Sequence, residues 1–284
     1  MRAAGAVGVL SFALDRSLIL YRYPAMTQTG RIELWTTTGA GGDARRLTVV
    51  TPPEGRALLD AQLTHRGDVV YAVSETVDGN VDDLFRFDHR TRRAHFMFSV
   101  RGLGPFATSP DGLRIAYSRE LPVAGKPATF VANIDGTHQR QVAPVAASYS
   151  LAWPVSDTLF MVGGEGRCWF CALSVATGSG HAVPVPVKDL DGLPVVSPSA
   201  DYVATDDLTG PAGERIYTTS GKLLRNITGA GGGEAFWSPD EQQLLIQSPG
   251  LKVFDFTTHQ LAIFRHSGPK TMGVLDWKST NTAK

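Results

Sequence analysis

The sequence alternates apolar and polar residues in short runs that are separated by tight turns. The stretch FATSPDGLRIAYSRE (Phe106–Glu120) contains one alternating run, a Ser-Pro-Asp-Gly turn and a second alternating run. A period of two is typical of strands with one buried face, and Ser-Pro-Asp-Gly has the residues that a tight turn requires. No segment carries an apolar stripe of helical period over ten or more residues. We therefore predict an all-β protein.

Copies of this phrase, some of them degenerate, recur along the chain every 40 to 51 residues. When the copies are aligned, the turn position is occupied by Ala13, Thr64, Ser109, Pro154, Ser197, Ser238 and Lys278. Six residues after the turn, the first six copies all carry an apolar residue: Ile19, Val70, Ile115, Phe160, Val203 and Leu244. Two more strand-like runs around a second turn follow each of these copies, as in TFVANIDGTHQRQVA (Thr129–Ala143). Four antiparallel strands per unit of this length predict a six-bladed β-propeller.

The repeat also predicts how the chain is divided. We expect a single domain over residues 1–284, with a closing strand at 272–278 and blades at approximately 7–57, 58–103, 104–148, 149–191, 192–232 and 233–271. A lone four-stranded blade cannot hide both faces from water, whereas blades stacked in a ring cover one another. The run GVLDWK (Gly273–Lys278) is expected to complete the sheet that contains Val9–Tyr23. The alternative is that this run opens a seventh blade.

The repeat phrase resembles that of a known family. SPDGLRIAYSRE followed by DGTHQRQVA, together with FWSPDEQQLLIQS, is similar to the TolB-like propeller repeat, a relative of the WD repeat. The resemblance covers nearly the whole chain and is best in the third and sixth blades. It implies a propeller that lies outside the bacterial cytoplasm, usually in the periplasm, and that binds a protein. Similar propellers also gate serine peptidases of the prolyl-oligopeptidase class. The α/β domain of periplasmic TolB has no counterpart in this sequence, so no particular partner is implied.

The N-terminal stretch MRAAGAVGVLSFAL allows two interpretations. One Arg followed by a soft apolar run faintly resembles a secretory signal. The same residues fit the first strand of the repeat, over Gly8–Leu14, because Phe12 falls in register with the later copies. We favour the strand.

Charge and hydropathy exclude two classes of partner. Lys plus Arg and Asp plus Glu number 27 each, and the densest basic cluster, HRTRRAH (His89–His95), falls at a predicted turn. A sequence-independent nucleic-acid binder needs several cations on one face, so we expect no nucleic-acid partner. No apolar run approaches the ~18 residues of a membrane-spanning helix, so we expect no membrane span. We expect a monomer.

The sequence contains no convincing motif for catalysis, metal binding or phosphate binding. The two cysteines form CWFC (Cys168–Cys171), and residues three apart in a strand point to opposite faces, so we expect two unpaired thiols rather than a disulfide, redox or zinc site. G-x-S-x-G and H-E-x-x-H are absent, and the seven histidines are scattered. The glycine runs at Gly39–Gly42 and Gly229–Gly233 lack the Lys-Ser/Thr of a phosphate loop, and we expect turns there. We predict no catalytic residue, no metal and no cofactor.

The predicted innermost strands carry three carboxylates in an otherwise small and apolar lining. These are Asp60, Glu234 and Asp276, and ring closure brings their blades next to one another. Oxygen ligands of this kind hold calcium in proteins, so the three residues are our candidate binding site in the channel. The alternative is that each carboxylate caps a strand end or pairs with a nearby Arg.

Three functions follow from these observations. The first is a non-catalytic scaffold that recognises a protein or peptide at a ring face or at the channel mouth, since loops on a rigid scaffold are where recognition usually occurs. The second is a channel-centred, metal-dependent hydrolase of the lactonase type. The third is a sensor or gating propeller of a larger protein. The sequence favours the first.

Overall fold

The computed structural model describes residues 8–9, 17–23, 30–38, 42–64, 66–75, 81–120, 127–163, 168–186, 193–207, 213–231, 233–248, 250–264 and 273–279. Over these residues the chain forms strands and turns, and they include no helix long and apolar enough to span a membrane. The strands build six sheets, which we number blades 1 to 6 in chain order. The chain divides into two compact units, which are described separately.

Unit 1 (Met1–Leu103, Ile134–Thr137 and Arg265–Lys284) holds blades 1 and 2. Blade 1 has the strand order β1-β25-β2-β3-β4, with β1 (Gly8–Val9), β25 (Gly273–Ser279), β2 (Ser17–Tyr23), β3 (Ile32–Thr38) and β4 (Arg45–Val50). Blade 2 follows chain order, with β5 (Arg56–Leu63), β6 (Val69–Glu75), β7 (Asp82–Asp88) and β8 (Arg93–Val100). Of the basic run, His89–Arg92 form the turn that was predicted between β7 and β8, and Arg93–His95 begin β8.

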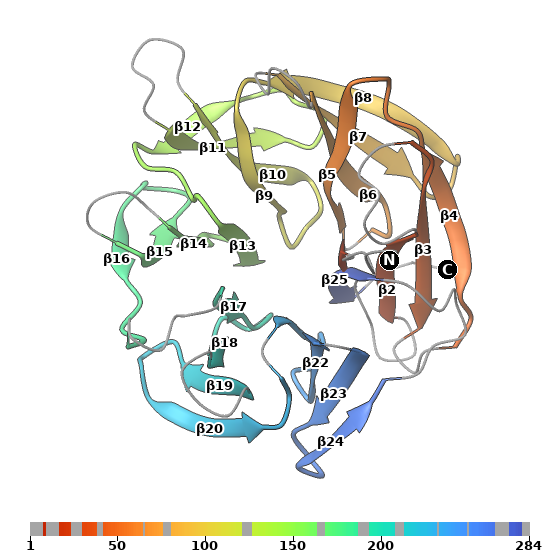
Figure 1. The fold of residues 1–284 in the computed structure, drawn as a ribbon. Coiled ribbons are helices and arrows are strands. Elements are labelled where there is room, and N and C mark those ends of the chain that lie inside the picture. The colour runs from red at the N-terminus through yellow and green to blue at the C-terminus, as the bar shows by residue number, and fades with distance from the viewer. Residues whose placement is uncertain are drawn as a thin grey trace. The chain divides into compact units, whose positions relative to one another are not determined.

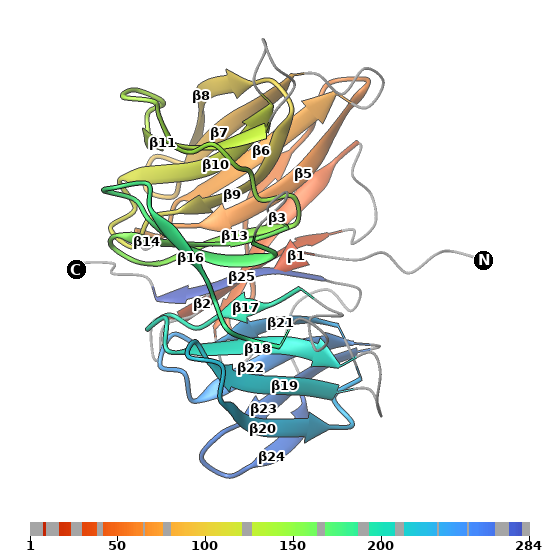
Figure 2. The same cartoon turned by 90° about the vertical axis from the view of Figure 1, so that its left-hand side faces the viewer.

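The last strand of the chain pairs with the first two; β25 and β2 can be found in Figure 1, and β1 is labelled in Figure 2. β25 runs antiparallel to β2, with Leu20 opposite Asp276, and parallel to β1, with Gly8 opposite Val274. The expected pairing of GVLDWK with the sheet of β2 is therefore present. Of the strand expected over Gly8–Leu14, the structure describes Gly8–Val9 as β1, which pairs with β25, while β25 lies between β1 and β2. Phe12 and Ala13 lie outside the described residues.

Unit 2 (Gly104–Asn133 and His138–Phe264) holds blades 3 to 6, each a four-stranded antiparallel sheet in chain order. Blade 3 consists of β9 (Leu103–Thr108), β10 (Arg114–Glu120), β11 (Pro127–Asn133) and β12 (Arg140–Ala143). Blade 4 consists of β13 (Ser150–Val155), β14 (Thr158–Val162), β15 (Phe170–Ser174) and β16 (Gly180–Ala182). Blade 5 consists of β17 (Val195–Val196), β18 (Tyr202–Asp207), β19 (Gly213–Thr218) and β20 (Leu223–Thr228). Blade 6 consists of β21 (Glu234–Trp237), β22 (Gln243–Ser248), β23 (Gly250–Asp255) and β24 (Gln260–Ile263).

Three copies of the repeated turn share a hydrogen-bonding pattern, which explains why a serine stands at the first position of each. The side-chain oxygens of Ser109, Ser197 and Ser238 are buried and accept backbone N–H groups of the residues five positions later, at 2.9, 3.1 and 2.8 Å. The backbone N–H of each serine in turn donates to the carbonyl of the same later residue. Each serine therefore closes the turn between the first and second strands of its blade. A buried alanine here would leave these backbone donors without that acceptor.

The faces of neighbouring blades in unit 2 cover one another, as Figure 2 shows for blades 5 and 6. Between blades 5 and 6 a buried cluster joins Ala204 and Ile216 of blade 5 to Ala235, Trp237 and other apolar residues of blade 6. Equivalent clusters lie between blades 3 and 4 and between blades 4 and 5. The apolar columns of the sequence repeat thus form contacts between sheets, and burial of this surface is the main stabilising contribution.

Candidate functional site

The three predicted channel carboxylates lie in different parts of the structure. Asp60 is half-buried on β5, where its Oδ1 accepts the N–H of Ala61 at 2.8 Å. Glu234 is exposed at the start of β21. Asp276 is on β25, which packs beside β5 in unit 1. Because Glu234 belongs to unit 2 and the other two to unit 1, the convergence of all three stays a prediction.

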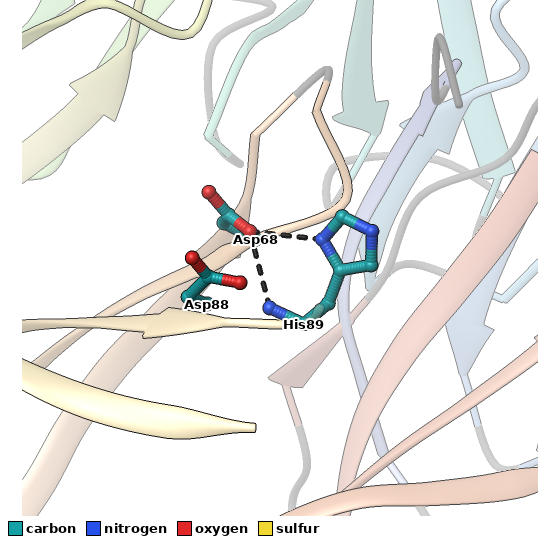
Figure 3. Close-up of side chains that lie close together, drawn as sticks. All are labelled: Asp68, Asp88 and His89. Atoms are coloured by element: carbon teal, nitrogen blue, oxygen red, sulfur yellow. Dashed lines mark hydrogen bonds and ion pairs between the residues drawn. The ribbon is translucent and has the colours of Figure 1, made fainter. Parts of the chain in front are cut away.

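A first cluster of potential metal ligands is found in blade 2 (Figure 3). Asp68 lies in the turn before β6, Asp88 ends β7 and His89 follows it, and ligand atoms of all three are within 4.8 Å of one another. Asp68 is 3% exposed. Its Oδ1 accepts the backbone N–H of His89 at 3.1 Å and lies 2.9 Å from His89 Nδ1. Its Oδ2 accepts hydrogen bonds from Nε of Arg86, at 2.8 Å, and from a terminal guanidinium nitrogen of the same residue.

These contacts account for the close approach of the three side chains without a bound metal. The buried carboxylate of Asp68 already faces the permanent positive charge of Arg86, which would repel a cation bound at the same oxygens. Asp88 is used elsewhere, because its Oδ1 accepts the N–H groups of Arg90 and Thr91 at 2.8 and 2.9 Å. The Thr91 hydrogen bond lowers the pKa of Asp88 below its ordinary value. We conclude that the Asp68 cluster joins two turns of blade 2.

A second candidate is an exposed pair of aromatic rings on blade 4. Tyr149 directly precedes β13 and Trp169 directly precedes β15. Their ring centroids are 5.3 Å apart with an interplanar angle of 52°. Tyr149 is 56% exposed and Trp169 is 40% exposed. Two large rings in contact with each other and with solvent form an apolar surface on the end of this sheet.

Backbone contacts through Gly163 hold both rings in place. The N–H groups of Ser148 and Tyr149 donate to Val162 O at 3.1 and 3.2 Å, and the N–H of Gly163 donates to Trp169 O at 2.8 Å. Gly163 has φ +84°, and a β-carbon placed there would lie 2.4 Å from Cδ2 of Tyr149. The ring of Tyr149 therefore packs directly on a backbone that only glycine allows.

A disulfide flanks Trp169 and corrects the expectation of two unpaired thiols. Cys168 and Cys171 are bonded, with their Cα atoms 5.8 Å apart. The sequence argument assumed that both cysteines lie in one strand and point to opposite faces. Instead, β15 begins at Phe170 and the chain bends at Trp169, so strand alternation does not apply to Cys168. The bond constrains the residue that carries the exposed ring.

The aromatic pair is suited to recognition rather than to catalysis. Tyr and Trp supply a large contact area with few rotatable bonds, so little conformational entropy is lost when a partner covers them. Both ring types are enriched at the energetic centre of protein interfaces. Sequence reasoning missed the pair, because the two residues are 20 positions apart and meet through the backbone of Val162 and Gly163. The available signal was an aromatic residue immediately before two strands of one blade.

Comparisons with known proteins support the fold. No family model and no curated protein matches the sequence. The structure matches that of TolB from Acinetobacter baumannii with a TM-score of 0.67 and 14% identity, covering 87% of this chain and 62% of TolB. It matches a chain of the nidogen/laminin complex with a TM-score of 0.63 and 11% identity, covering 93% and 99%. It matches oligogalacturonate lyase in complex with manganese with a TM-score of 0.61 and 12% identity, covering 93% and 78%.

These likenesses settle the architecture. The neighbours are β-propellers, and the six four-stranded antiparallel sheets give the blade number. The predicted six-bladed propeller of the TolB-like kind is confirmed as the fold. The chain spans less than two thirds of the TolB structure, and at these identities the likeness shows the fold alone.

Proposed function

We propose that this propeller is a non-catalytic scaffold that binds a protein or peptide, and that Tyr149 and Trp169 anchor the partner on the exposed end of blade 4. The observation that carries the proposal is the fixed, solvent-exposed contact between the two rings. Exposed aromatic side chains are costly to leave in water and gain most when a partner excludes that water.

Two further observations support the proposal. One neighbour of the same fold is a chain in a complex between two proteins, nidogen and laminin. The disulfide between Cys168 and Cys171 supports a location outside the cytoplasm, such as the periplasm, because disulfides persist in oxidising compartments. We also propose that residues 1–284 act as one propeller domain with the blade limits given above, and that it is monomeric.

Selection from a random peptide-display library on the immobilised full chain tests the proposal. We expect peptides enriched on the wild type to be lost when the same pool is applied to the Tyr149→Ala/Trp169→Ala double variant. Phe96→Ala is the matched control, because Phe96 is a 58% exposed aromatic residue on blade 2. If the enriched peptides are retained equally by the double variant and the control, the aromatic pair is not the binding surface.

An enzymatic function is the second candidate, and the manganese-bound lyase of the same fold favours it. In this alternative Asp60, Glu234 and Asp276 hold a cation in the channel. Elemental analysis of the purified chain distinguishes the two functions, with Asp60→Asn, Glu234→Gln and Asp276→Asn as variants. A cation that co-purifies and is lost in all three variants supports the enzyme. Under the binding proposal the three variants select the same peptides as the wild type.

A further inference from the structure

An arginine on blade 3, the neighbour of the blade that carries the aromatic pair, has no counter-charge. Arg119 is the last residue but one of β10, and its side chain is half-buried. Its guanidinium lies over the ring of Phe130, with 3.8 Å between its central carbon and the ring centroid. Its Nε is buried without a hydrogen-bond partner, and within the described part of the chain no carboxylate pairs with it. Burial of a charge in this way is costly unless a partner is supplied.

Arg114, at the other end of the same strand, shows how such a group is satisfied within the chain. It too stacks on an aromatic ring, since its guanidinium carbon lies 4.8 Å from the ring centroid of Trp153. Its guanidinium also donates to Ser156 O at 3.3 Å and lies 3.8 Å from a carboxylate oxygen of Asp111. Arg119 shares the stacking and lacks oxygen partners of this kind among the described residues. Its donors are therefore available to a ligand.

Two stacked rings hold the guanidinium of Arg119 in place. Tyr117 is directly opposite Phe130 in the sheet, and their ring centroids are 5.8 Å apart with an interplanar angle of 20°. Tyr117 is fully buried, and its hydroxyl donates to Gln139 Oε1 at 2.9 Å. A guanidinium on such a platform keeps its charge and its planar set of donors, and it loses little further freedom when a carboxylate binds.

Arg119 lies near the connection that carries Tyr149. The Oγ of Ser118, the residue before Arg119, accepts the N–H of Ala147 at 3.0 Å. Ala147 precedes Tyr149 by two residues, and all four residues belong to unit 2. Covalent geometry through this hydrogen bond limits the separation of the Cα atoms of Arg119 and Tyr149 to about 18 Å or less. An extended peptide of about six residues covers that distance.

The connection between the two blades is fixed to blade 3 by further contacts. Thr129 on β11 donates to Val145 O at 2.8 Å. A β-carbon placed on Gly104 of β9 would lie 3.1 Å from Cβ of Ser118 and 3.4 Å from Ala147 O, so three strands and the connection pack closely. Arg119 and the aromatic pair therefore keep a constant spacing. A charged and an apolar contact at a constant spacing select partners that carry matching groups at that spacing.

We propose that the partner is an acidic peptide segment in extended conformation, and that Arg119 binds the carboxylate of an Asp or Glu side chain in it. This inference rests on the proposed function, because Tyr149 and Trp169 bind an apolar side chain of the same segment. The carboxylate supplies the counter-charge that Arg119 lacks within the described chain, and it accepts hydrogen bonds from the guanidinium. The acidic residue and the apolar residue of the partner lie within about six positions of each other.

Peptides selected on the wild-type full chain from the random display library test the inference. We expect the enriched sequences to carry Asp or Glu within about six positions of an aromatic or large apolar residue. One such peptide is synthesised with an amidated C-terminus, so that its carboxylate comes from a side chain, and its dissociation constant is measured by isothermal titration calorimetry. Arg119→Gln should weaken binding by about tenfold or more. Arg114→Gln is the matched control and should bind as the wild type does.

The charge of Arg119 is tested by changing the peptide as well. Replacement of the peptide's acidic residue by its amide should weaken binding as much as Arg119→Gln does, and the two changes together should cost no more than either alone. Arg119→Lys keeps the charge without the planar donors and should restore part of the affinity. Added NaCl should weaken binding by the wild type more than binding by Arg119→Gln.

The outcomes separate this inference from the proposed function. Peptides that need Tyr149 and Trp169 but bind Arg119→Gln as tightly as the wild type would overturn the inference and leave the proposed function standing. Enrichment of peptides without an acidic residue, or binding that needs a free C-terminal carboxylate, would do the same. Failure to enrich any peptide, or peptides that bind the double variant of the aromatic pair as tightly as the wild type, would overturn both.

Discussion

Gly163 supports the ring of Tyr149 so closely that a β-carbon on the glycine would lie 2.4 Å from Cδ2 of the tyrosine. We predict that Gly163→Ala destabilises the chain for two reasons, the positive φ and the steric conflict. The first costs about 1–2 kcal/mol, and the second displaces Tyr149 from Trp169. Gly55→Ala separates the two contributions, because Gly55 has φ +75° and open space around its Cα. Urea unfolding should show a larger loss for Gly163→Ala, and equal losses would mean that Tyr149 is not held by this glycine.

The buried carboxyl of Glu214 on β19 makes stability depend on pH. Glu214 is 1% exposed, and its burial, together with the charge of Asp206, raises its pKa to about 9. Between the ordinary value of 4.5 and about 9, the folded chain keeps a proton on Glu214 that the unfolded chain releases. The free energy of unfolding should therefore be highest below pH 4.5 as far as this group is concerned, and should fall as pH rises towards 9. The expected slope is at most about 1.4 kcal/mol per pH unit for one proton.

Urea unfolding across this pH range measures the effect. The difference in unfolding free energy between Glu214→Gln and the wild type should grow with pH, because glutamine cannot ionise. Asp201→Asn is the control and should run parallel to the wild type, because Asp201 is an exposed carboxylate on the same blade. A constant difference between Glu214→Gln and the wild type from pH 5 to pH 9 would show that Glu214 titrates normally in the folded chain.

The Asp68 cluster should be important for stability and indifferent to metal. Asp68→Asn leaves Arg86 without its buried counter-charge, and we expect a loss of about 2–4 kcal/mol, near the range for breaking a buried ion pair. Asp111→Asn is the control, since Asp111 and Arg114 form an exposed pair at 3.8 Å that should contribute less than about 1 kcal/mol. Chemical denaturation compares the two variants. Losses of equal size would contradict the structural role of Asp68.

Alkylation followed by mass spectrometry tests the disulfide between Cys168 and Cys171. Unreduced chain, unfolded in urea, should take up no iodoacetamide, and reduction should expose two thiols. Reduction should lower the unfolding free energy by about 2 kcal/mol, as the loop-entropy relation gives for so short a loop. The Cys168→Ser/Cys171→Ser variant should be insensitive to reductant. Uptake of two alkyl groups before reduction would restore the expectation of unpaired thiols.

The parts of the fold that follow from local pattern were predictable from sequence. Turn serines such as Ser109 and Ser238 are recognisable because the residues that close a turn are adjacent in the chain. Strands follow from period two, and the pairing of Gly273–Lys278 with β2 follows from counting strands per blade.

The candidate sites depend on contacts that no local pattern encodes. Tyr149 and Trp169 meet because both bind the backbone around Gly163, and the hydrogen bond from Ala147 to Ser118 places Arg119 near the connection that carries Tyr149. The disulfide requires a bend at Trp169 that a periodic interpretation does not contain. Sequence alone therefore identified the scaffold, whereas the side chains of the proposed site were found only from the packing.

A double-mutant cycle on Tyr149 and Trp169 tests the proposed binding surface most directly. The dissociation constant of a peptide selected on the wild type is measured for the wild type, Tyr149→Ala, Trp169→Ala and the double variant, with Phe96→Ala as control. Each single change should weaken binding by about tenfold or more, and the double change should weaken it by less than the product, because the two rings act as one surface. Dissociation constants that stay at the wild-type value in both single variants and in the double variant would contradict the account.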